Sequence, residues 1–262
     1  MLLQSPRLVN LSLPKTGSTT IGRIFEPVGG THEGLHDLTV GFILDYLEGL
    51  ITHQQLSKLL VRRQRLIRAT VDSSTFLHLV APEVYKLLPP STLYLQVLRD
   101  PMSWAESYLS MLVGVGASLV SSPSNADLAW TSRYGSYQAA GLDPVTLYHN
   151  LDNEEYIVPI VLQLFLFWRR SVLRVQNAIP PSQLCATPLT NLAKVIPMLA
   201  DLIQVPLDSL NMNALMSNIG SRVPGIRNVI ANHVSAAIQT DAVGYARAVA
   251  LYSQICETDG NV

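Results

Sequence analysis

The distribution of apolar residues along the chain predicts strands that alternate with helices. A short aliphatic run, Leu8–Leu13, ends at Pro14 and is followed by a glycine-containing turn and a helical pattern over 19–25. This order is typical of a strand, a loop and a helix. A second apolar run, Thr92–Leu98, is nearly continuous, as in the buried strands of parallel sheets. Pro101 then stands where proline often begins a helix, so the chain contains a second strand-to-helix unit.

Further segments show the same two periodicities. Apolar spacing of three and four residues predicts helices over 40–50, 54–67, 83–88, 104–112, 156–175, 192–203 and 236–256. Two weaker strand candidates lie at 67–72 and 183–187. Small residues in 114–127 predict a surface loop or lid, and 220–232 also resembles a loop. Strands and helices that alternate through one continuous chain predict a single α/β domain over 1–262, with a central, mostly parallel sheet flanked by helices.

Composition narrows the class of protein. The chain has 262 residues, of which 48% are apolar, enough for a folded core. Charged residues make up only 14%, compared with roughly 25% in an average soluble domain. The net charge of −1 provides no positive field to attract DNA or RNA, so we expect no nucleic-acid partner. Cys185 and Cys256 lack metal-ligand spacing, which argues against zinc and against a disulfide scaffold.

No segment predicts a membrane protein. The first seven residues lack the basic and apolar regions of a signal peptide. The most apolar run, 156–168, contains a proline and is too short to cross a bilayer. We therefore expect a cytoplasmic protein with no membrane partner. The sparse surface charge is compatible with a homodimer.

The turn after the first predicted strand has the composition of an anion site. Its sequence, Pro-Lys-Thr-Gly-Ser-Thr-Thr over 14–20, opens a helix, so backbone N–H groups and hydroxyls face the positive end of the helix dipole. Lys15 precedes Gly17, so the turn is not a Walker A loop, in which lysine follows a glycine. A lysine in this place can put its ammonium on a leaving oxygen. The alternative is an ordinary turn in which Ser and Thr cap the helix.

The second strand-to-helix turn contains an arginine and a serine eight positions apart. Arg99 directly follows the strand and Ser107 lies within the next helix, so the two can bind a phosphate. With both motifs in this order, the chain resembles the sulfotransferases that use 3′-phosphoadenosine 5′-phosphosulfate (PAPS). The resemblance covers about the first 110 residues.

The resemblance implies a P-loop-NTPase-like sulfotransferase fold, PAPS as cofactor, its product PAP (adenosine 3′,5′-bisphosphate) and no metal. The late basic loop of the family has its nearest match at 220–222, although a plain surface arginine is the alternative there. The resemblance assigns cofactor binding to Lys15, Thr16, Gly17, Ser18, Thr19, Thr20, Arg99, Ser107 and Arg222. Lys15 is also expected to stabilise the charge on the bridging oxygen.

The acceptor must lose a proton as it attacks, so a base should lie near the first turn. Segment 31–37 holds four candidates. The resemblance implies Glu33 as the catalytic base, with His32 as its partner or substitute, and His36 is less favoured. The alternative is a solvated loop or helix start in which Asp37 pairs locally.

Two further residues could supply the base. Asp72 ends the strand candidate 67–72, and ligands gather at the carboxyl ends of parallel strands. His78 follows shortly after it, although a lone histidine is often a core or capping residue. The basic run 61–68 could attract an anionic acceptor or form a solvated helix face.

These observations predict transfer of a sulfuryl group from PAPS to a hydroxyl or nitrogen of a small-molecule acceptor. Family context suggests a natural product. One alternative is a P-loop nucleotide kinase with 95–100 as its Walker B strand, against which the position of Lys15 argues. The other alternative is a non-catalytic nucleotide-binding module of the same fold.

Overall fold

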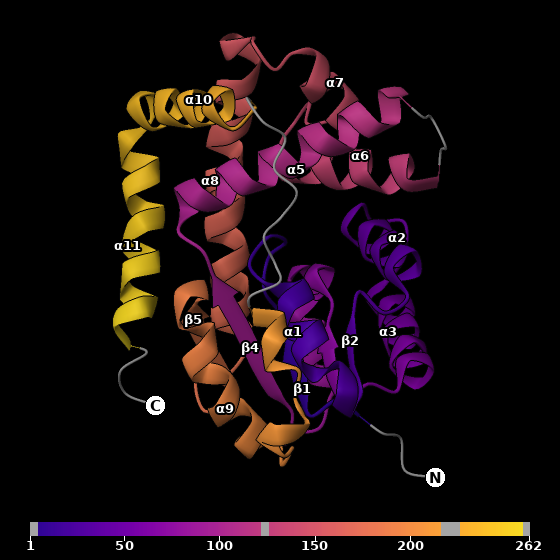
Figure 1. The fold of residues 1–262 in the computed structure, drawn as a ribbon. Coiled ribbons are helices and arrows are strands. Elements are labelled where there is room, and N and C mark those ends of the chain that lie inside the picture. The colour runs from indigo at the N-terminus through magenta and orange to yellow at the C-terminus, as the bar shows by residue number, and fades with distance from the viewer. Residues whose placement is uncertain (1–4, 122–125, 216–225, 259–262) are drawn as a thin grey trace. The chain divides into compact units, whose positions relative to one another are not determined.

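The computed structural model describes residues 5–121, 126–215 and 226–258. The chain divides into two compact units, which are described separately (Figure 1). The sheet unit comprises Met1–Leu98, Ser171–Ile219 and Ile255–Val262. The helical unit comprises Arg99–Arg170 and Gly220–Gln254.

The sheet unit is built on five parallel strands in the order β2-β3-β1-β4-β5. The strands are β1 (Leu8–Asn10), β2 (Gly30–His32), β3 (Val71–Ser73), β4 (Leu93–Leu98) and β5 (Leu184–Pro188). This order confirms the predicted α/β fold and is consistent with a P-loop-like arrangement. The chain leaves β1 toward β2 on one side and continues from β4 to β5 on the other. The carboxyl ends of β1 and β4 therefore form the switch point where open α/β sheets bind ligands.

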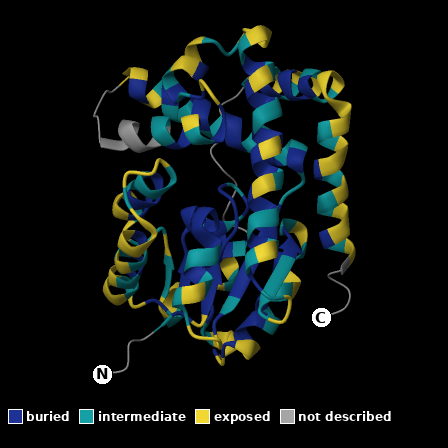
Figure 2. Ribbon diagram, turned by 180° about the vertical axis from the view of Figure 1, so that it is seen from behind, coloured by how far each residue is buried: buried dark blue, intermediate teal, exposed yellow. Residues whose placement is uncertain are grey.

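Alternate residues of β4 face two helical layers. Leu95 and Val97 belong to a buried apolar cluster together with residues of α1 (Ser18–Phe25) and α9 (Leu192–Leu202). In Figure 2 the helices carry exposed residues on their outer faces, while β1, β3 and most of β4 are buried; β2 and β5, at the two edges of the sheet, are less so. This packing fixes the start of α1 beside the end of β1.

The opposite face of the sheet contacts α3 (His53–Ile67), α4 (Ala81–Leu87) and the last turns of α8 (Glu154–Ala178). The side-chain amide of Gln96 donates to the Val172 carbonyl oxygen at 3.4 Å. The sheet is thus covered by helices on both faces, as expected of an all-parallel sheet.

The helical unit contains α5 (Pro101–Ser121), α6 (Ala126–Gln138), α7 (Pro144–His149), α8 as far as Arg170, α10 (Ile226–Thr240) and most of α11 (Ala242–Thr258). Trp104 and Tyr108 of α5 stack with ring centroids 5.3 Å apart. Phe167 of α8 packs on Trp104 at 6.4 Å. These rings pack in the core of this unit together with buried aliphatic residues of the same helices, such as Leu109, Leu112 and Leu164.

Most predicted elements are present. The helices predicted over 40–50, 54–67, 83–88, 156–175 and 192–203 correspond to α2 (His36–Leu47), α3, α4, α8 and α9. The strand predicted from Leu8 to Leu13 ends at Asn10, because the chain from 11 onward turns into the loop before α1.

Three local predictions are wrong. The stretch 114–127, expected as a loop, is helical through Ser121, and its residues 122–125 lie outside the described residues. Gly116 is small for packing: a Cβ there would lie 2.0 Å from the Pro144 carbonyl oxygen. The stretch 220–232, expected as a loop, is helical from Ile226 onward. The single helix predicted over 236–256 is two helices, because Asp241 caps the start of the second one by accepting from the Gly244 N–H at 2.8 Å.

One described helix, α8, is long and apolar enough to cross a membrane. Of its most apolar 18-residue window, 56% is buried inside the protein, as in the core helix of a soluble protein. One such helix is weak evidence for a membrane span.

Candidate functional site

The loop between β1 and α1 turns sharply at two residues. Lys15 (φ 65°) and Gly17 (φ 95°) both have left-handed backbone conformation. A Cβ on Gly17 would lie 2.9 Å from Cδ1 of Leu189. Glycine therefore suits this position for two reasons: it adopts the positive φ without strain, and it leaves room for the Leu189 side chain. Helix α1 then begins at Ser18, and among the described residues no side chain caps it. The first N–H groups of α1 thus carry the positive end of the helix dipole, as the anion-site prediction requires.

A network of buried hydrogen bonds holds the loop between β1 and α1 in place. The Asn10 side-chain amide donates to Ser73 Oγ at 2.9 Å, and Asn10 Oδ1 accepts from the Ser12 N–H at 3.2 Å. The Ser73 hydroxyl donates to the Ser18 carbonyl oxygen at 2.8 Å, and Ser12 Oγ accepts from the Val97 N–H at 2.7 Å. The network therefore fixes the ends of β1 and β3 and the start of α1 against β4.

The predicted anion-binding residues differ in exposure. Lys15, Gly17 and Thr19 are partly exposed. The hydroxyl of Thr16 is fully buried and donates to the Leu13 carbonyl oxygen at 2.5 Å, so this side chain stabilises the loop. The side chains of Ser18 and Thr20 are also buried, each 5% exposed. Contact of these three residues with an anion would have to come mainly from their backbone N–H groups.

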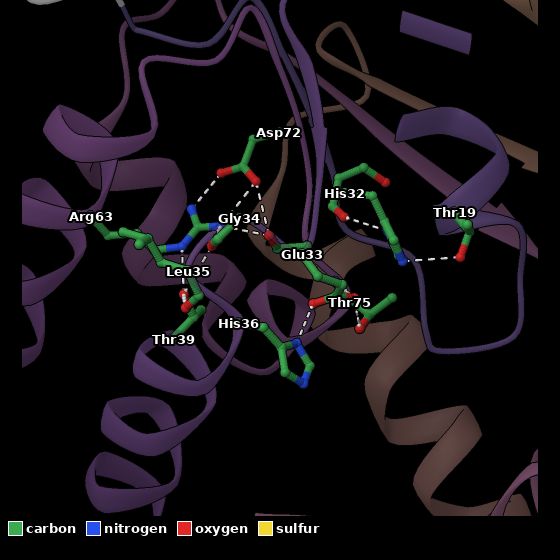
Figure 3. A network of polar contacts seen from close by, with 12 residues as sticks. Thr19, His32, Glu33, Gly34, Leu35, His36, Thr39, Arg63, Asp72 and Thr75 are labelled. Carbon is green, nitrogen blue, oxygen red and sulfur yellow. Dashed lines mark hydrogen bonds and ion pairs between the residues drawn. The ribbon is translucent and has the colours of Figure 1, made fainter. Parts of the chain in front are cut away.

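His32 lies at the end of β2, beside the first turn of α1. Gly22 of α1 makes this approach possible, because a Cβ there would lie 2.5 Å from the His32 Cβ. His32 Nδ1 lies 3.3 Å from the Ser73 carbonyl oxygen and Nε2 lies 3.0 Å from Thr19 Oγ1 (Figure 3). Since a carbonyl only accepts, Nδ1 carries the proton and Nε2 accepts from the Thr19 hydroxyl. His32 therefore connects the loop to β3.

Glu33 contacts His36 rather than His32. Glu33 Oε2 lies 2.9 Å from His36 Nδ1, while Oε1 accepts from the Thr75 N–H at 3.1 Å and from the Thr75 hydroxyl at 2.6 Å. Glu33 (φ 54°) and Leu35 (φ 55°) both have left-handed backbone conformation, which costs about 1–2 kcal/mol for a residue with a side chain. Strain of this kind is often found at functional sites.

Burial and neighbouring groups set the charge of Glu33 and His32, the side chains predicted as the base and its partner. Burial by itself would raise the pKa of Glu33, but hydrogen bonds from His36 and Thr75 lower it below its ordinary value. Partial burial of the ring lowers the pKa of His32, although the Glu33 carboxylate and the Ser73 carbonyl act in the opposite direction. At neutral pH Glu33 is therefore ionised and His32 is neutral.

Asp72 forms a buried ion pair with Arg63. The guanidinium bonds both carboxylate oxygens, at 2.5 and 3.0 Å, and both side chains are 0% exposed. Burial would raise the pKa of Asp72, but the charge and hydrogen bonds of Arg63 lower it. Arg63 also donates to the Gly34 carbonyl oxygen at 3.3 Å and to Thr39 Oγ1 at 2.8 Å. Asp72 therefore anchors the segment that carries Glu33, a structural role rather than that of a base.

The remaining basic residues of 61–68 are mostly exposed, as the solvated-face interpretation predicts; the buried Arg63 is the exception. Arg62 and Arg65, with Lys58, line an open cavity of about 620 Å³ beside α3. This cavity does not include the loop before α1.

His78 is fully buried. Its Nδ1 bonds to the Thr75 carbonyl oxygen, and burial lowers the pKa of His78 to about 4. The ring is therefore neutral at pH 7, and its burial argues against a role as the base for a bound acceptor.

The second predicted motif belongs to the helical unit. Arg99 is half-buried and precedes α5, where Asp100 caps the helix by accepting from the Ser103 N–H at 3.0 Å. Burial lowers the pKa of Arg99, while Asp100 and Glu106 raise it. Ser107 is half-buried on α5. Arg222 lies outside the described residues.

Sequence reasoning missed the residues that orient the site, chiefly Asn10, Ser12, Arg63 and Thr75. For Asn10 and Ser12 the available signal was polar residues inside an apolar strand run, whereas Arg63 lies in a helix among other basic residues. Several of their partners lie far away in the sequence, as Ser73 does from Asn10, Val97 from Ser12 and Glu33 from Thr75. Within the described ranges, no group of three His, Cys, Asp or Glu side chains could hold a metal ion.

A scan against models of protein families finds no matching family, and searches among curated proteins and among solved structures find no match.

Proposed function

We propose that the protein transfers a sulfuryl group from PAPS to a hydroxyl or nitrogen of a small-molecule acceptor. The observation that carries this proposal is the loop before α1. It places Lys15 and the start of α1 at the switch point of a parallel sheet, with Glu33 and two histidines in the same unit. We further propose a cytoplasmic enzyme whose acceptor is a natural product.

In this reaction the acceptor atom attacks sulfur in line, and the bond from sulfur to the bridging oxygen breaks as PAP leaves. N–H groups of 17–20 hold the phosphosulfate, and the Lys15 ammonium stabilises the negative charge that develops on the bridging oxygen. By the resemblance, Arg99, Ser107 and Arg222 bind the 3′-phosphate. The acceptor's proton goes to a base in the segment after β2, and the scheme needs no metal.

Binding of PAP without metal tests the proposal against the kinase alternative. A ligand that binds only the folded state at about 100 times its Kd stabilises the protein by about 2.7 kcal/mol. We therefore expect PAP with EDTA to raise the Tm, and ATP with Mg²⁺ to leave it unchanged. Stabilisation by ATP with Mg²⁺ alone would refute the sulfotransferase assignment.

Replacing Lys15 tests catalysis against a non-catalytic binding module. Transfer of labelled sulfate from PAPS to a panel of alcohols, phenols, amines and guanidines identifies accepted substrates. We expect Lys15→Ala to lose roughly 10²–10³-fold in kcat while PAP still raises the Tm. Lys58→Ala, on the exposed face of α3, is the matched control and should keep wild-type kcat. PAP binding by a wild type that sulfates no acceptor favours the binding module.

A further inference from the structure

We infer that His32 is a positioning residue of the proposed cofactor site: it sets the direction of the Thr19 hydroxyl and takes up a proton as the phosphosulfate binds. This inference rests on the proposed function and concerns the binding of the cofactor, not the identity of the base. The observation behind it is the contact between His32 Nε2 and Thr19 Oγ1 at 3.0 Å (Figure 3).

Thr19 carries the accessible hydroxyl at the start of α1. The side chains of Ser18 and Thr20 are each 5% exposed, and that of Thr16 is fully buried. Thr19, in contrast, is partly exposed. It is the second residue of α1, among the N–H groups that carry the positive end of the helix dipole. Of the hydroxyls of 16–20, that of Thr19 is therefore the one placed to donate to an anion held by these N–H groups.

The neutral form of His32 occupies this hydroxyl. Nδ1 carries the proton, because it lies 3.3 Å from the Ser73 carbonyl oxygen, which only accepts. Nε2 is then an acceptor, and the Thr19 hydroxyl donates its single proton to it. While His32 is neutral, Thr19 has no proton left to donate to an anion.

Protonation of His32 reverses this hydrogen bond without moving either side chain. Both ring nitrogens then donate, Nδ1 to the Ser73 carbonyl oxygen as before and Nε2 to the Thr19 oxygen. The Thr19 hydroxyl now accepts from the ring and can turn its own proton toward the anion. The site thus gains a donor and a positive charge together, and both favour a phosphosulfate. The proton comes from the solvent, to which His32 is exposed.

The surroundings of His32 keep the ring neutral in the absence of an anion. Partial burial lowers the pKa of His32 below its ordinary value. The Glu33 carboxylate and the Ser73 carbonyl oxygen act in the opposite direction, while His36 of α2 and Arg23 of α1 lower the pKa further. An anion bound beside Nε2 raises the pKa. The anion therefore binds more tightly as the pH falls through the pKa of His32 in the complex, and the gain is complete below the pKa in the free protein.

The pH dependence of PAPS binding tests this role. In calorimetry without acceptor, we expect the affinity of the wild type relative to His32→Gln to be roughly three- to tenfold higher at about pH 5.5 than at about pH 8. Glutamine is the matched replacement, because it has one donor and one acceptor, as the neutral ring does, but takes up no proton. Titration of PAPS itself affects both proteins equally. His53→Gln, at the exposed start of α3, is the control and should follow the wild type.

Replacing Thr19 tests whether its hydroxyl depends on His32. We expect Thr19→Val to weaken PAPS binding by roughly tenfold at about pH 5.5 and by less than about twofold at about pH 8. The reason is that the hydroxyl serves the anion only when the ring is protonated. Thr19→Ser keeps a hydroxyl and should restore the wild-type pattern. An equal loss at both pH values would mean that Thr19 acts on the anion independently of His32, which overturns the inference.

Titration of the imidazole signals by NMR measures the uptake of the proton in the wild type, whatever the stability of the variants. Saturating PAP should raise the pKa of His32 and leave that of His53 unchanged. The inference is overturned if PAP leaves the pKa of His32 unchanged, or if PAPS binding to His32→Gln follows pH as in the wild type. Either result, with PAPS bound, leaves the proposed function standing. A wild type that binds neither PAPS nor PAP refutes the proposed function, and with it the role of His32.

Discussion

At the residue scale, the buried His78 contacts a residue of the candidate site and makes the stability of the fold depend on pH. The ring lies wholly inside the sheet unit, and its Nδ1 bonds to the carbonyl oxygen of Thr75. The N–H and hydroxyl of the same Thr75 hold the carboxylate of Glu33. Protonation of His78 would place a charge in this buried space, so the folded state resists it, as the pKa of about 4 expresses.

We predict that the free energy of unfolding falls as the pH is lowered from about 6.5 to 4. In that window the unfolded chain binds a proton at residue 78 and the folded chain does not, so stability rises with pH. The full effect of this shift is about 3 kcal/mol. The lowered pKa of His32 acts in the same direction, and those of Glu33 and Asp72 add to it at lower pH.

Urea unfolding at a series of pH values measures this dependence. His78→Gln should flatten it, even if the variant is less stable at pH 7, while His53→Gln should keep the wild-type slope. Equal slopes in His78→Gln and the wild type would show that His78 is not its source.

At the scale of elements, α3 is attached to the sheet by one buried ion pair. Arg63 of α3 reaches Asp72 of β3 and also the Gly34 carbonyl oxygen, in the segment between β2 and α2. This pair therefore positions the backbone directly after Glu33. The other described cations of α3 are exposed, so this helix supports the candidate site through Arg63.

We predict that Arg63→Met lowers the free energy of unfolding by about 3–5 kcal/mol, because it leaves the Asp72 carboxylate buried without its partner. Arg63→Met combined with Asp72→Leu should recover much of this loss, since no uncompensated charge remains. Arg62→Met, at the exposed neighbouring position, should change stability by less than about 0.5 kcal/mol. Strictly additive effects of the two substitutions in urea unfolding would contradict the account.

The sequence was informative where a local pattern decides the structure. The apolar run of β4 and the long helix α8 are evident from spacing, and the polar turn after β1 indicates the loop. Strand β2 was missed because Gly-Thr-His has no apolar run, and what makes it a strand is its backbone pairing with β3. The contact of Glu33 with Thr75 joins positions 42 residues apart, so no local pattern could indicate it.

At the scale of the whole molecule, the two predicted phosphate motifs belong to different compact units. Lys15 lies in the sheet unit, and Arg99 and Ser107 lie in the helical unit. With charged residues at only 14% of the chain, cations at the two strand-to-helix turns stand out. The chain as a whole provides no broad positive field, so the proposal requires recognition of a small anion by individually placed groups.

The assignment of Arg99 to the 3′-phosphate is tested by two nucleotides that differ in that group alone. Loss of one hydrogen bond to a charged group costs about 1.5–3 kcal/mol, or roughly ten- to a hundredfold in Kd. We predict that Arg99→Ala weakens binding of PAP by this factor and leaves binding of AMP, which lacks the 3′-phosphate, unchanged in calorimetry. Arg170→Ala, an exposed arginine of the same unit, should change neither. An equal loss for both nucleotides would mean that Arg99 acts on the fold or on another part of the ligand, since only a direct contact with the 3′-phosphate discriminates between the two.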